Sequence, residues 1–286
     1  MSEHANSLQR ASEEQATTDI HAESSFHHSV QEGEARSHRS RHSLIATGLM
    51  GGLDVSIGVL AMLVVKEQTG STVAGALAFS IGFVVLLLAH SELFTENFLH
   101  PVTAWVARKA SAFDVFRLWL GTLLFNLLGG WLFAWLIVWG LPRVHATAID
   151  TASELVARTN GELIALGIMA GMAITLLTWI EESAKSSDFG RTITAIGIAF
   201  VLVAAHLNHI IVVSIEVFVA LHTGMAPFGY DEWLRIAGIA LVTNVIGGVV
   251  LVTGLRVLAA GREGIEEERA RGHAHIVSPS SRISSE

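Results

Sequence analysis

Long runs of apolar residues alternate with short polar gaps along most of this chain. Six of these runs are each near the roughly 20 residues that an α-helix needs to cross a bilayer. They cover residues 43–65, 72–106, 113–141, 163–180, 192–221 and 234–259. Runs of this length predict an all-α integral membrane protein with six transmembrane helices.

The second and fifth runs carry polar residues in their middles. The second run is interrupted by a polar stretch from Glu92 to Asn97, and the fifth contains His206, Asn208 and His209. Backbone that leaves a helix at membrane depth must be buried in protein or line a water-filled cavity. We therefore expect the second and fifth helices to be interrupted.

Polar segments flank the apolar region at both ends. Residues 1–40 are rich in Ser, His, Glu and Arg, and residues 261–286 begin with a run of charges. Such segments bury too little apolar surface to offset the entropy of the chain. We expect a disordered cytoplasmic tail over 1–40, a transmembrane pore domain over 41–260 and a second disordered cytoplasmic tail over 261–286. Residues 1–40 also lack the apolar core of a secretory signal peptide.

The Lys and Arg residues near the ends of the predicted helices indicate the orientation, because cytoplasmic loops are enriched in them. One side has ten and the other has four, which places both termini in the cytoplasm of a plasma (inner) membrane protein. An even number of helices also requires both termini on one side. The larger set is Arg36, Arg39, Arg41, Arg108, Lys109, Arg117, Lys185, Arg191, Arg256 and Arg262, and the smaller is Lys66, Arg143, Arg158 and Arg235.

The two halves of the apolar region repeat three short motifs in the same order, at offsets of 116 to 119 residues. Each half holds three predicted helices, so the second half enters the membrane upside down. Inverted repeats place a solute site near the midplane, at interrupted helices. The second and fifth helices are corresponding members of the two halves. The repeat pairs residues 48–52 with 167–171, His90 with His206, and Asn126 with Asn244.

Composition is consistent with a membrane pore and excludes several other classes. Only 15% of the residues are charged, against about a quarter in soluble proteins. The net charge of −8 argues against nucleic-acid binding, which favours a basic patch. The chain has no cysteine, which excludes disulfides and thiolate metal sites. We expect no cofactor, no bound metal and no enzymatic activity.

The first interruption supplies candidate pore residues. Thr95 can offer a hydroxyl to a cavity, and Leu93 and Phe94 can form an apolar constriction. We expect Glu92 to be structural, because a carboxylate there can accept hydrogen bonds from the free N–H groups of a broken helix. Asn97 is a second structural polar residue at membrane depth.

The second interruption supplies a titratable group. His206 and His209 are three residues apart and would share one helical face. Histidine changes charge near neutral pH, so His209 at the centre of a pore could exchange a proton with a permeating weak acid. We expect Asn208 to line the pore and His206 to be structural. Two further structural residues, Asn126 and Asn244, are expected to form hydrogen bonds between helices.

These motifs resemble the formate/nitrite transporter family, over residues 40–260. The segment from Glu92 to Asn97 is similar to the family's Glu-Leu-Phe-Thr-x-Asn sequence. The Asn-x-x-Gly pieces that begin at Asn126 and Asn244 also resemble the family, and His209 falls at its central pore histidine. Within this family, the sequence resembles most a divergent branch of the enterobacterial type.

The resemblance implies a homopentamer with one pore through each protomer and an aquaporin-like arrangement of helices. It implies that small monovalent anions of weak acids, such as formate or nitrite, pass through the pore. Leu93 and Phe94 would form the cytoplasmic constriction, and Thr95 would face His209 from a mobile loop.

Three departures from the family pattern bear on selectivity. Asn208 stands where the family usually has Glu, and Val213 stands where it has Asn. The family's Lys before the fourth helix has no match, although Arg158 lies nearby.

Other functions stay open at this point. The pore could pass water or other small neutral solutes, although the aquaporin Asn-Pro-Ala signature is absent. A metal-binding or enzymatic membrane protein could use His90, Glu92, His206 and His209. A sensory role is a third alternative, in which histidines make the N-terminal tail pH-sensitive. These histidines are His4, His21, His27, His28, His38 and His42.

Overall fold

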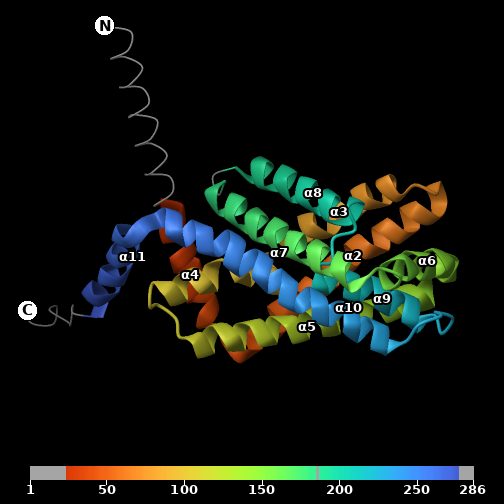
Figure 1. Cartoon of the computed structure of the whole chain (residues 1–286), viewed down its shortest axis with the longest axis horizontal. Helices are drawn as coiled ribbons and strands as arrows, with labels where there is room; N and C mark the ends of the chain where they lie inside the picture. Colours follow the sequence, from red (N-terminus) through yellow and green to blue (C-terminus); the bar gives the residue numbers. More distant parts are fainter. Residues whose placement is uncertain (1–23, 185–186, 277–286) are drawn as a thin grey trace, which may run out of the picture.

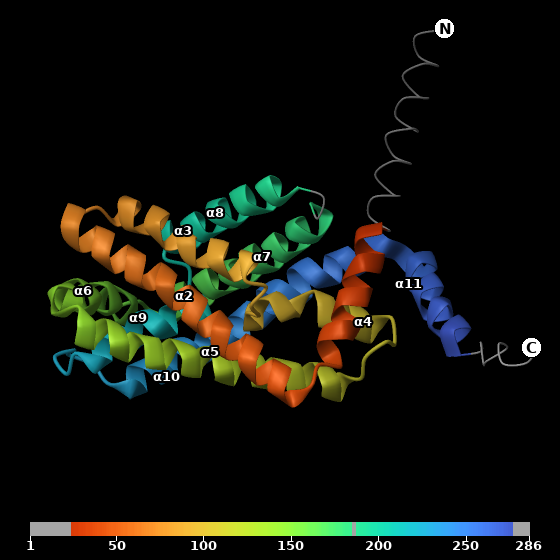
Figure 2. The same ribbon diagram turned by 180° about the vertical axis from the view of Figure 1, so that it is seen from behind.

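A computed structural model describes residues 24–184 and 187–276 of the chain. Every regular element in this part is helical, so the prediction of an all-helical protein is confirmed. The main helices lie side by side as an elongated bundle (Figure 1). Seen from behind, α2 (Arg41–Thr69) runs beside α3 (Thr72–Leu88) and α5 (Ala112–Gly140), and it contacts both (Figure 2).

Four helices of the described chain are long and apolar enough to cross a membrane. They are α2, α5, α7 (Asn160–Ser183) and the helical run Tyr230–Ala270. This run combines α10 (Tyr230–Val245), the π-helix η3 (Ile246–Thr253) and most of α11 (Gly254–Ile276). Two shorter apolar helices are α3 and α9 (Ile210–His222). The remaining elements are η1 (Phe94–Phe98), α4 (His100–Val106), η2 (Pro142–Val144), α6 (His145–Val156) and α8 (Asp188–Ala204).

Capping residues explain where several helices begin. Ser and Thr are good N-caps because their oxygens accept hydrogen bonds from the free N–H groups of the first turn. Five helices start in this way, and two of the caps form a full capping box with an acidic residue three positions later. The five caps are Ser40, Ser71, Ser111, Thr159 and Ser187. At its other end α2 stops at Gly70, whose φ of 65° suits glycine.

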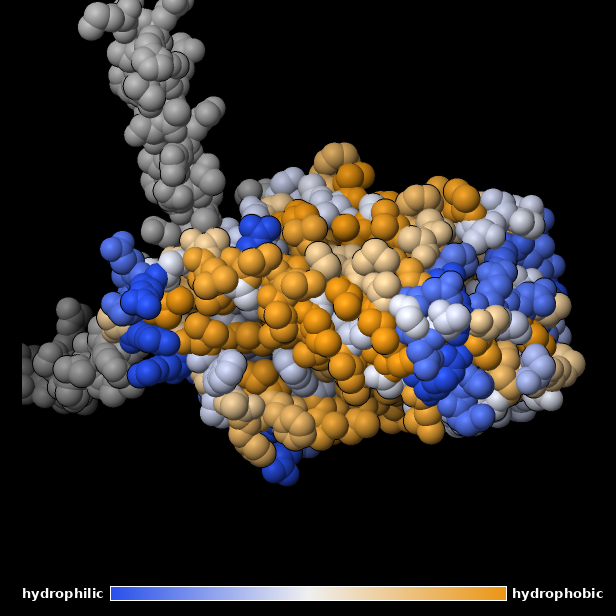
Figure 3. Space-filling model, viewed as in Figure 1, coloured by the Kyte–Doolittle hydropathy of each residue, from blue (hydrophilic) through white to orange (hydrophobic). Residues whose placement is uncertain are grey.

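On the face shown in Figure 3, apolar side chains form a broad band across the middle of the bundle, and polar side chains gather toward its two ends. Residues 24–37 and the C-terminal part of α11 lie at one end, which we call the tail end; α6 lies at the opposite end (Figure 1). Such a band matches the hydrocarbon layer of a bilayer.

The structure corrects the prediction of a disordered tail over residues 1–40, because residues 24–37 form a helix. Phe26 and Val30 on this helix are buried and pack with Ala107 against residues of α11. Gly33 approaches α4 so closely that an added Cβ would lie 1.8 Å from the carbonyl oxygen of His100. Residues 1–23 of the predicted tail lie outside the described residues.

The predicted disordered tail over 261–286 also differs from the structure, because α11 continues to Ile276. The helix bends at Gly261, whose φ is 70°. The segment after the bend returns to the N-terminal helix, where Glu268 lies 2.6 Å from the ring of His27. The two predicted tails therefore stabilise each other through this contact and a shared apolar cluster.

Candidate functional site

The first break in the bundle lies between α3 and α4. Helix α3 ends at Leu88, and His90 takes up a left-handed conformation with φ of 54°. A non-glycine residue rarely adopts this conformation, which ends the helical hydrogen-bonding pattern. The chain then runs through the short helix η1 before α4 begins at His100.

The second break lies between α8 and α9, and it too contains a histidine in the left-handed conformation. His206 has a φ of 51°, and residues 205–209 are outside any helix. His90 and His206 are the pair that the sequence repeat aligns. The expectation that His206 and His209 share one helical face is wrong, because α8 ends at Ala204 and both histidines lie outside any helix.

Asn126 of α5 forms three hydrogen bonds, two with the first break and one with α2. Its Nδ2 donates to the carbonyl oxygens of Gly48 (2.7 Å) and Glu92 (2.9 Å). Its Oδ1 accepts from the N–H of Phe94 at 2.8 Å. Backbone groups released from a helix at membrane depth need such partners, and Asn126 is fully buried.

Asn244 of α10 binds the second break in the same way. Its Nδ2 donates to the carbonyl oxygens of Gly167 and Asn208, both at 2.9 Å. Its Oδ1 accepts from the N–H of Ile210 at 3.0 Å. Each hydrogen bond of Asn126 therefore has a counterpart at Asn244. The partner residues also occupy positions that the sequence repeat aligns.

Two glycines let the helices approach these asparagines. A Cβ added at Gly52 of α2 would lie 2.2 Å from the carbonyl oxygen of Asn126. A Cβ added at Gly171 of α7 would lie 2.1 Å from the carbonyl oxygen of Asn244. Real Cβ atoms do not come this close to an oxygen, so both contacts require glycine.

The carboxylate of Glu92 has partners other than the free N–H groups of the broken helix that the sequence led us to expect. Its carboxylate turns to Arg39, which forms a salt bridge with it, and to the hydroxyl of Thr47 at 3.2 Å. The free N–H groups of the loop have other acceptors: that of Leu93 donates to Glu96 at 3.3 Å, and that of Phe94 donates to Asn126. The carboxylate of Glu92 therefore joins the loop to the segment before α2.

The two breaks meet at Thr95 and His209. The Thr95 Oγ1 lies 2.8 Å from the His209 Nε2, and both residues are fully buried. His209 is also the N-cap of α9, because its Nδ1 accepts the N–H of Val212 at 3.4 Å. With Nδ1 as an acceptor, a neutral imidazole carries its proton on Nε2 and donates it to Thr95.

Aromatic side chains hold the loop that carries Thr95. The rings of Phe94 and Phe98 are 5.0 Å apart edge to face, and Phe98 lies 5.5 Å from Trp119 of α5. The Trp119 Nε1 donates to the carbonyl oxygen of Asn97 at 2.8 Å. The amide side chain of Asn97 also reaches Thr122, at 3.4 Å. Leu93 is fully buried and Phe94 is 2% exposed, so the loop is tightly packed.

Two arginines next to α2 also hold this loop, and the sequence analysis did not identify that role. Besides the salt bridge from Arg39 to Glu92, Arg36 donates to the Asn97 Oδ1 at 3.4 Å and lies 4.0 Å from the carboxylate of Glu96. Burial opposes the charge of Arg36, but the carboxylates around it, chiefly that of Glu92, raise its pKa above the ordinary value. The guanidinium therefore stays charged.

A sequence signal for the helix that carries Arg36 does exist. Phe26, Val30, Gly33 and Ser37 are spaced four, three and four residues apart, which places them on one helical face. All four are buried. Because two of the four are the small residues Gly33 and Ser37, the mean hydropathy of this helical face is low.

The remaining candidates lie toward the opposite end of the bundle. Asn208 points its Nδ2 at the carbonyl oxygen of Leu163 (3.2 Å) rather than at His209. Arg158 donates to the carbonyl oxygen of His206 at 3.5 Å. His206 is partly exposed, and Thr95 rather than His206 is the partner of His209.

The histidines and carboxylates do not converge on a metal site in the part of the chain that the structure describes. No group of three or more His, Cys, Asp or Glu side chains there has an arrangement that could hold a metal ion. The alternative based on His90, Glu92, His206 and His209 therefore has no structural support in these residues.

The sequence matches the formate/nitrite transporter family over residues 23–258. It is 25% identical to the inner membrane protein YfdC of Escherichia coli over 235 residues, which are 78% of this chain and 74% of YfdC. It is 26% identical to the formate channel FocA of Escherichia coli over 152 residues, or 48% of this chain and 52% of FocA.

Solved structures show the same fold. An ion channel of this family superimposes with a TM-score of 0.70 at 16% identity, over 82% of this chain and 98% of the channel. A pentameric formate channel with formate bound superimposes with a TM-score of 0.57 at 18% identity, over the same shares. The chain is therefore a multi-pass membrane protein that belongs to the formate/nitrite transporter family.

Proposed function

We propose that this chain forms a transmembrane pore for a small monovalent anion of a weak acid, such as formate or nitrite, and that His209 links its passage to a proton. The observation that carries the proposal is the hydrogen bond between Thr95 and His209. It joins the two helix breaks at a fully buried point. The formate channels among the relatives and solved structures support this class of substrate.

In the proposed architecture the chain crosses the membrane six times as two inverted halves. The second crossing is α3 followed by α4, and the fifth is α8 followed by α9. The matching hydrogen bonds of Asn126 and Asn244 support this arrangement, because each connects three elements of its own half. Both termini are cytoplasmic in this proposal, so the tail end faces the cytoplasm, and five copies form the assembly, as in the pentameric formate channel.

The proposed proton step uses both nitrogens of one imidazole. An anion that displaces Thr95 accepts a hydrogen bond from the His209 Nε2–H. A proton then binds at Nδ1, which releases the N–H of Val212, and the Nε2 proton passes to the anion. The imidazole is then neutral with its proton on Nδ1, and the solute leaves as a neutral acid. Return of that proton from Nδ1 to Nε2 restores the hydrogen bond from the Val212 N–H and completes the cycle. No covalent chemistry is required of the protein.

The apolar residues on the loop explain why the proton would matter. Leu93 and Phe94 directly precede Thr95 in the loop, and both are buried. A bare anion loses its hydration at such a constriction, which is costly without compensating hydrogen bonds. A neutral acid crosses the same constriction at a much lower cost. Asn208, next to His209, adds no negative charge that would repel an anion.

Uptake into proteoliposomes that contain the purified full chain tests the proposal. Formate, nitrite, acetate, lactate and hydrosulfide are offered in turn, with and without an inward proton gradient, and empty liposomes serve as the control. We expect one or two of these anions to enter, and to enter faster with the gradient. No uptake of any of these anions, by protein shown to be folded, would contradict the proposal and favour a pore for neutral solutes.

A further inference from the structure

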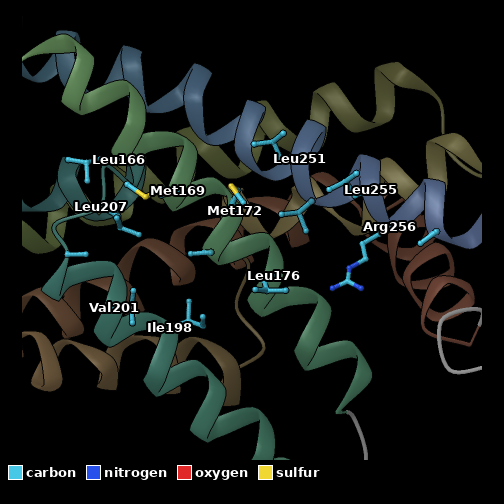
Figure 4. Close-up of a pocket in the computed structure, with 14 residues that line it drawn as sticks. Leu166, Met169, Met172, Leu176, Ile198, Val201, Leu207, Leu251, Leu255 and Arg256 are labelled. Atoms are coloured by element: carbon cyan, nitrogen blue, oxygen red, sulfur yellow. The ribbon is translucent and has the colours of Figure 1, made fainter. Parts of the chain in front are cut away.

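Two hollows in the bundle differ in polarity and in what encloses them. The first is a groove on the outside of α7, between α8 and the η3–α11 helix, and its lining is apolar except for Arg256 (Figure 4). The second is a polar chamber of about 340 Å³. Five parts of this chain line the chamber: the helix over residues 24–37, the first break, α4, α7 and α8. The lining of the chamber is therefore complete within one protomer.

The chamber lies between the Thr95–His209 pair and the tail end. Glu96, which follows Thr95 directly in the loop, contributes to the lining from the first break. Arg36 contributes from the helix over residues 24–37, which lies at the tail end (Figure 1). In the proposed function, a solute that leaves the pair toward the tail end therefore enters this chamber.

Negative charge prevails in the lining of the chamber. Four carboxylates face two guanidiniums there, which leaves an excess of negative charge when the histidines are neutral. Arg36 lies 2.8 Å from Glu32 and 4.0 Å from Glu96, so these two carboxylates share one guanidinium. Arg191 lies 3.4 Å from Asp188, which is exposed and is not part of the lining. The lining comprises Glu32, Glu96, Glu181, Glu182, Arg36, Arg191, His90, His100 and Thr178.

Two of these carboxylates, Glu181 and Glu96, bear most on a passing solute. Glu181, near the end of α7, forms no hydrogen bond or ion pair within the residues that the structure describes. The charges of Arg191 and Arg36 act on it from beyond ion-pair distance. Glu96 is 8% exposed and is the lining carboxylate next to the proposed pore. It stands at the position that the family's Glu-Leu-Phe-Thr-x-Asn sequence leaves open, so the family pattern does not prescribe its charge.

We propose that Glu96 and Glu181 make this chamber a charge filter at the tail end of the pore, which slows the entry of a bare anion from that side and lets a neutral acid pass. The inference rests on the proposed function and adds a preferred direction to it. A cleft of one charge sign between walls of low dielectric constant focuses the field on an entering ion. A neutral acid that arrives from His209 carries no net charge. Once it loses its proton in the chamber, the same carboxylates drive the anion out toward the tail end.

Protonation of the chamber weakens this filter. When Glu96 and Glu181 take up protons from the tail side, the excess of negative charge disappears. The other titratable groups of the lining act in the same direction, because a proton neutralises a glutamate and charges a histidine. These groups are Glu32, Glu182, His90 and His100. Arg39, in an adjoining hollow, forms the salt bridge with Glu92, and this pair adds no net charge.

Anion uptake into membrane vesicles of known sidedness tests this proposal. One preparation exposes the tail end of the full chain to the medium and the other exposes the opposite end, with the same pH on both sides. The probe is whichever of formate, nitrite, acetate, lactate and hydrosulfide enters proteoliposomes fastest. At pH 8 we expect Glu181→Gln to raise entry from the tail end roughly fivefold, the Coulomb effect of one charge about 8 Å away in a water-filled chamber. Entry from the opposite end should change little.

Two further readings separate a charge effect from a structural one. The gain in Glu181→Gln should shrink at pH 5 and at high ionic strength, which screens charges, and Glu181→Asp should behave like the wild type. The matched control is Glu34→Gln, which removes an exposed carboxylate of the helix over residues 24–37 that does not line the chamber.

The results that would overturn the filter differ from the one that would overturn the proposed function. Unchanged entry from the tail end in Glu181→Gln, or an equal gain from both sides, would show that the carboxylate is no filter. A gain that is the same at low and high ionic strength would also overturn the proposal. Absence of anion uptake from either side by the folded wild-type protein would instead overturn the proposed function, and the filter with it.

Discussion

Two asparagines, Asn126 and Asn244, hold the helix breaks in place. Each satisfies two carbonyl oxygens and one N–H, and each is fully buried. A buried polar group that loses its partner costs about 1–3 kcal/mol. Replacing either side chain by alanine removes this partner from one carbonyl oxygen and one N–H of the break. We therefore propose that these residues are structural, although they lie next to the proposed pore.

We predict that Asn126→Ala and Asn244→Ala destabilise the protein by similar amounts, of several times the roughly 1 kcal/mol of a typical hydrogen bond. Thermal unfolding in detergent, followed by tryptophan fluorescence, measures the effect. Asn160→Ala, at an exposed position of α7, is the matched control and should change the midpoint little. A large shift for Asn126→Ala with none for Asn244→Ala would contradict the equivalence of the two breaks.

A second prediction at the scale of single residues concerns the hydroxyl of Thr95. Thr95→Val keeps the shape of the side chain and removes the hydrogen bond to His209. Since a hydrogen bond between neutral groups contributes about 1 kcal/mol, we expect transport to fall roughly fivefold. Thr95→Ser keeps the hydroxyl and should retain most of the transport rate. Equal rates for the Val and Ser variants would show that the hydroxyl plays no part.

The residues of the central pair could be predicted from the sequence only in part. Thr95 and His209 stand out because they are polar within long apolar runs. Their contact depends on two breaks folding toward each other from opposite halves of the chain, and a single sequence contains no such distance. Glu92 was assigned the wrong partners for a related reason: Arg39 lies in a segment that the analysis treated as disordered.

At the scale of helices, the least expected element is the helix over residues 24–37. Its buried face contains Gly33 and Ser37 beside Phe26 and Val30, so hydropathy alone underestimates it. Its partners, α4 and α11, lie far away in the sequence. The polar residues inside the second and fifth apolar runs, by contrast, predict interruptions there without the structure.

Gly33→Ala tests how this helix is held. The added Cβ would overlap the carbonyl oxygen of His100, and overpacking of this kind costs about 1–3 kcal/mol. We expect the helix to detach more often, which trypsin would report as faster cleavage after Arg36 and Arg39. Gly161→Ala, where an added Cβ meets nothing within 4 Å, is the control. Unchanged cleavage in the Gly33 variant would indicate that the helix is not packed against α4 in solution.

At the scale of the whole molecule, the apolar band and the polar ends determine how the bundle sits in a membrane. Residues 24–37 and the end of α11 share the tail end (Figure 1), as expected when the chain crosses the membrane an even number of times. The Lys and Arg distribution predicts which side this is.

The absence of cysteine allows a direct test of the orientation. A single cysteine replaces His38 at the tail end or Arg143 at the opposite end; both positions are exposed. We predict that a membrane-impermeant maleimide applied to intact cells labels the Arg143→Cys variant and not the His38→Cys variant. Inside-out vesicles should reverse the result. The opposite pattern would place the termini outside and contradict the proposed topology.

The central claim, that His209 links solute passage to a proton, is tested most directly by His209→Asn in the proteoliposome assay. Asparagine is a good N-cap, so it can replace the imidazole at the start of α9 without being able to titrate. The variant should fold and unfold like the wild type. We predict that its uptake no longer rises with an inward proton gradient. If the uptake of the variant responds to the gradient as strongly as that of the wild type, the proposed role of His209 is wrong.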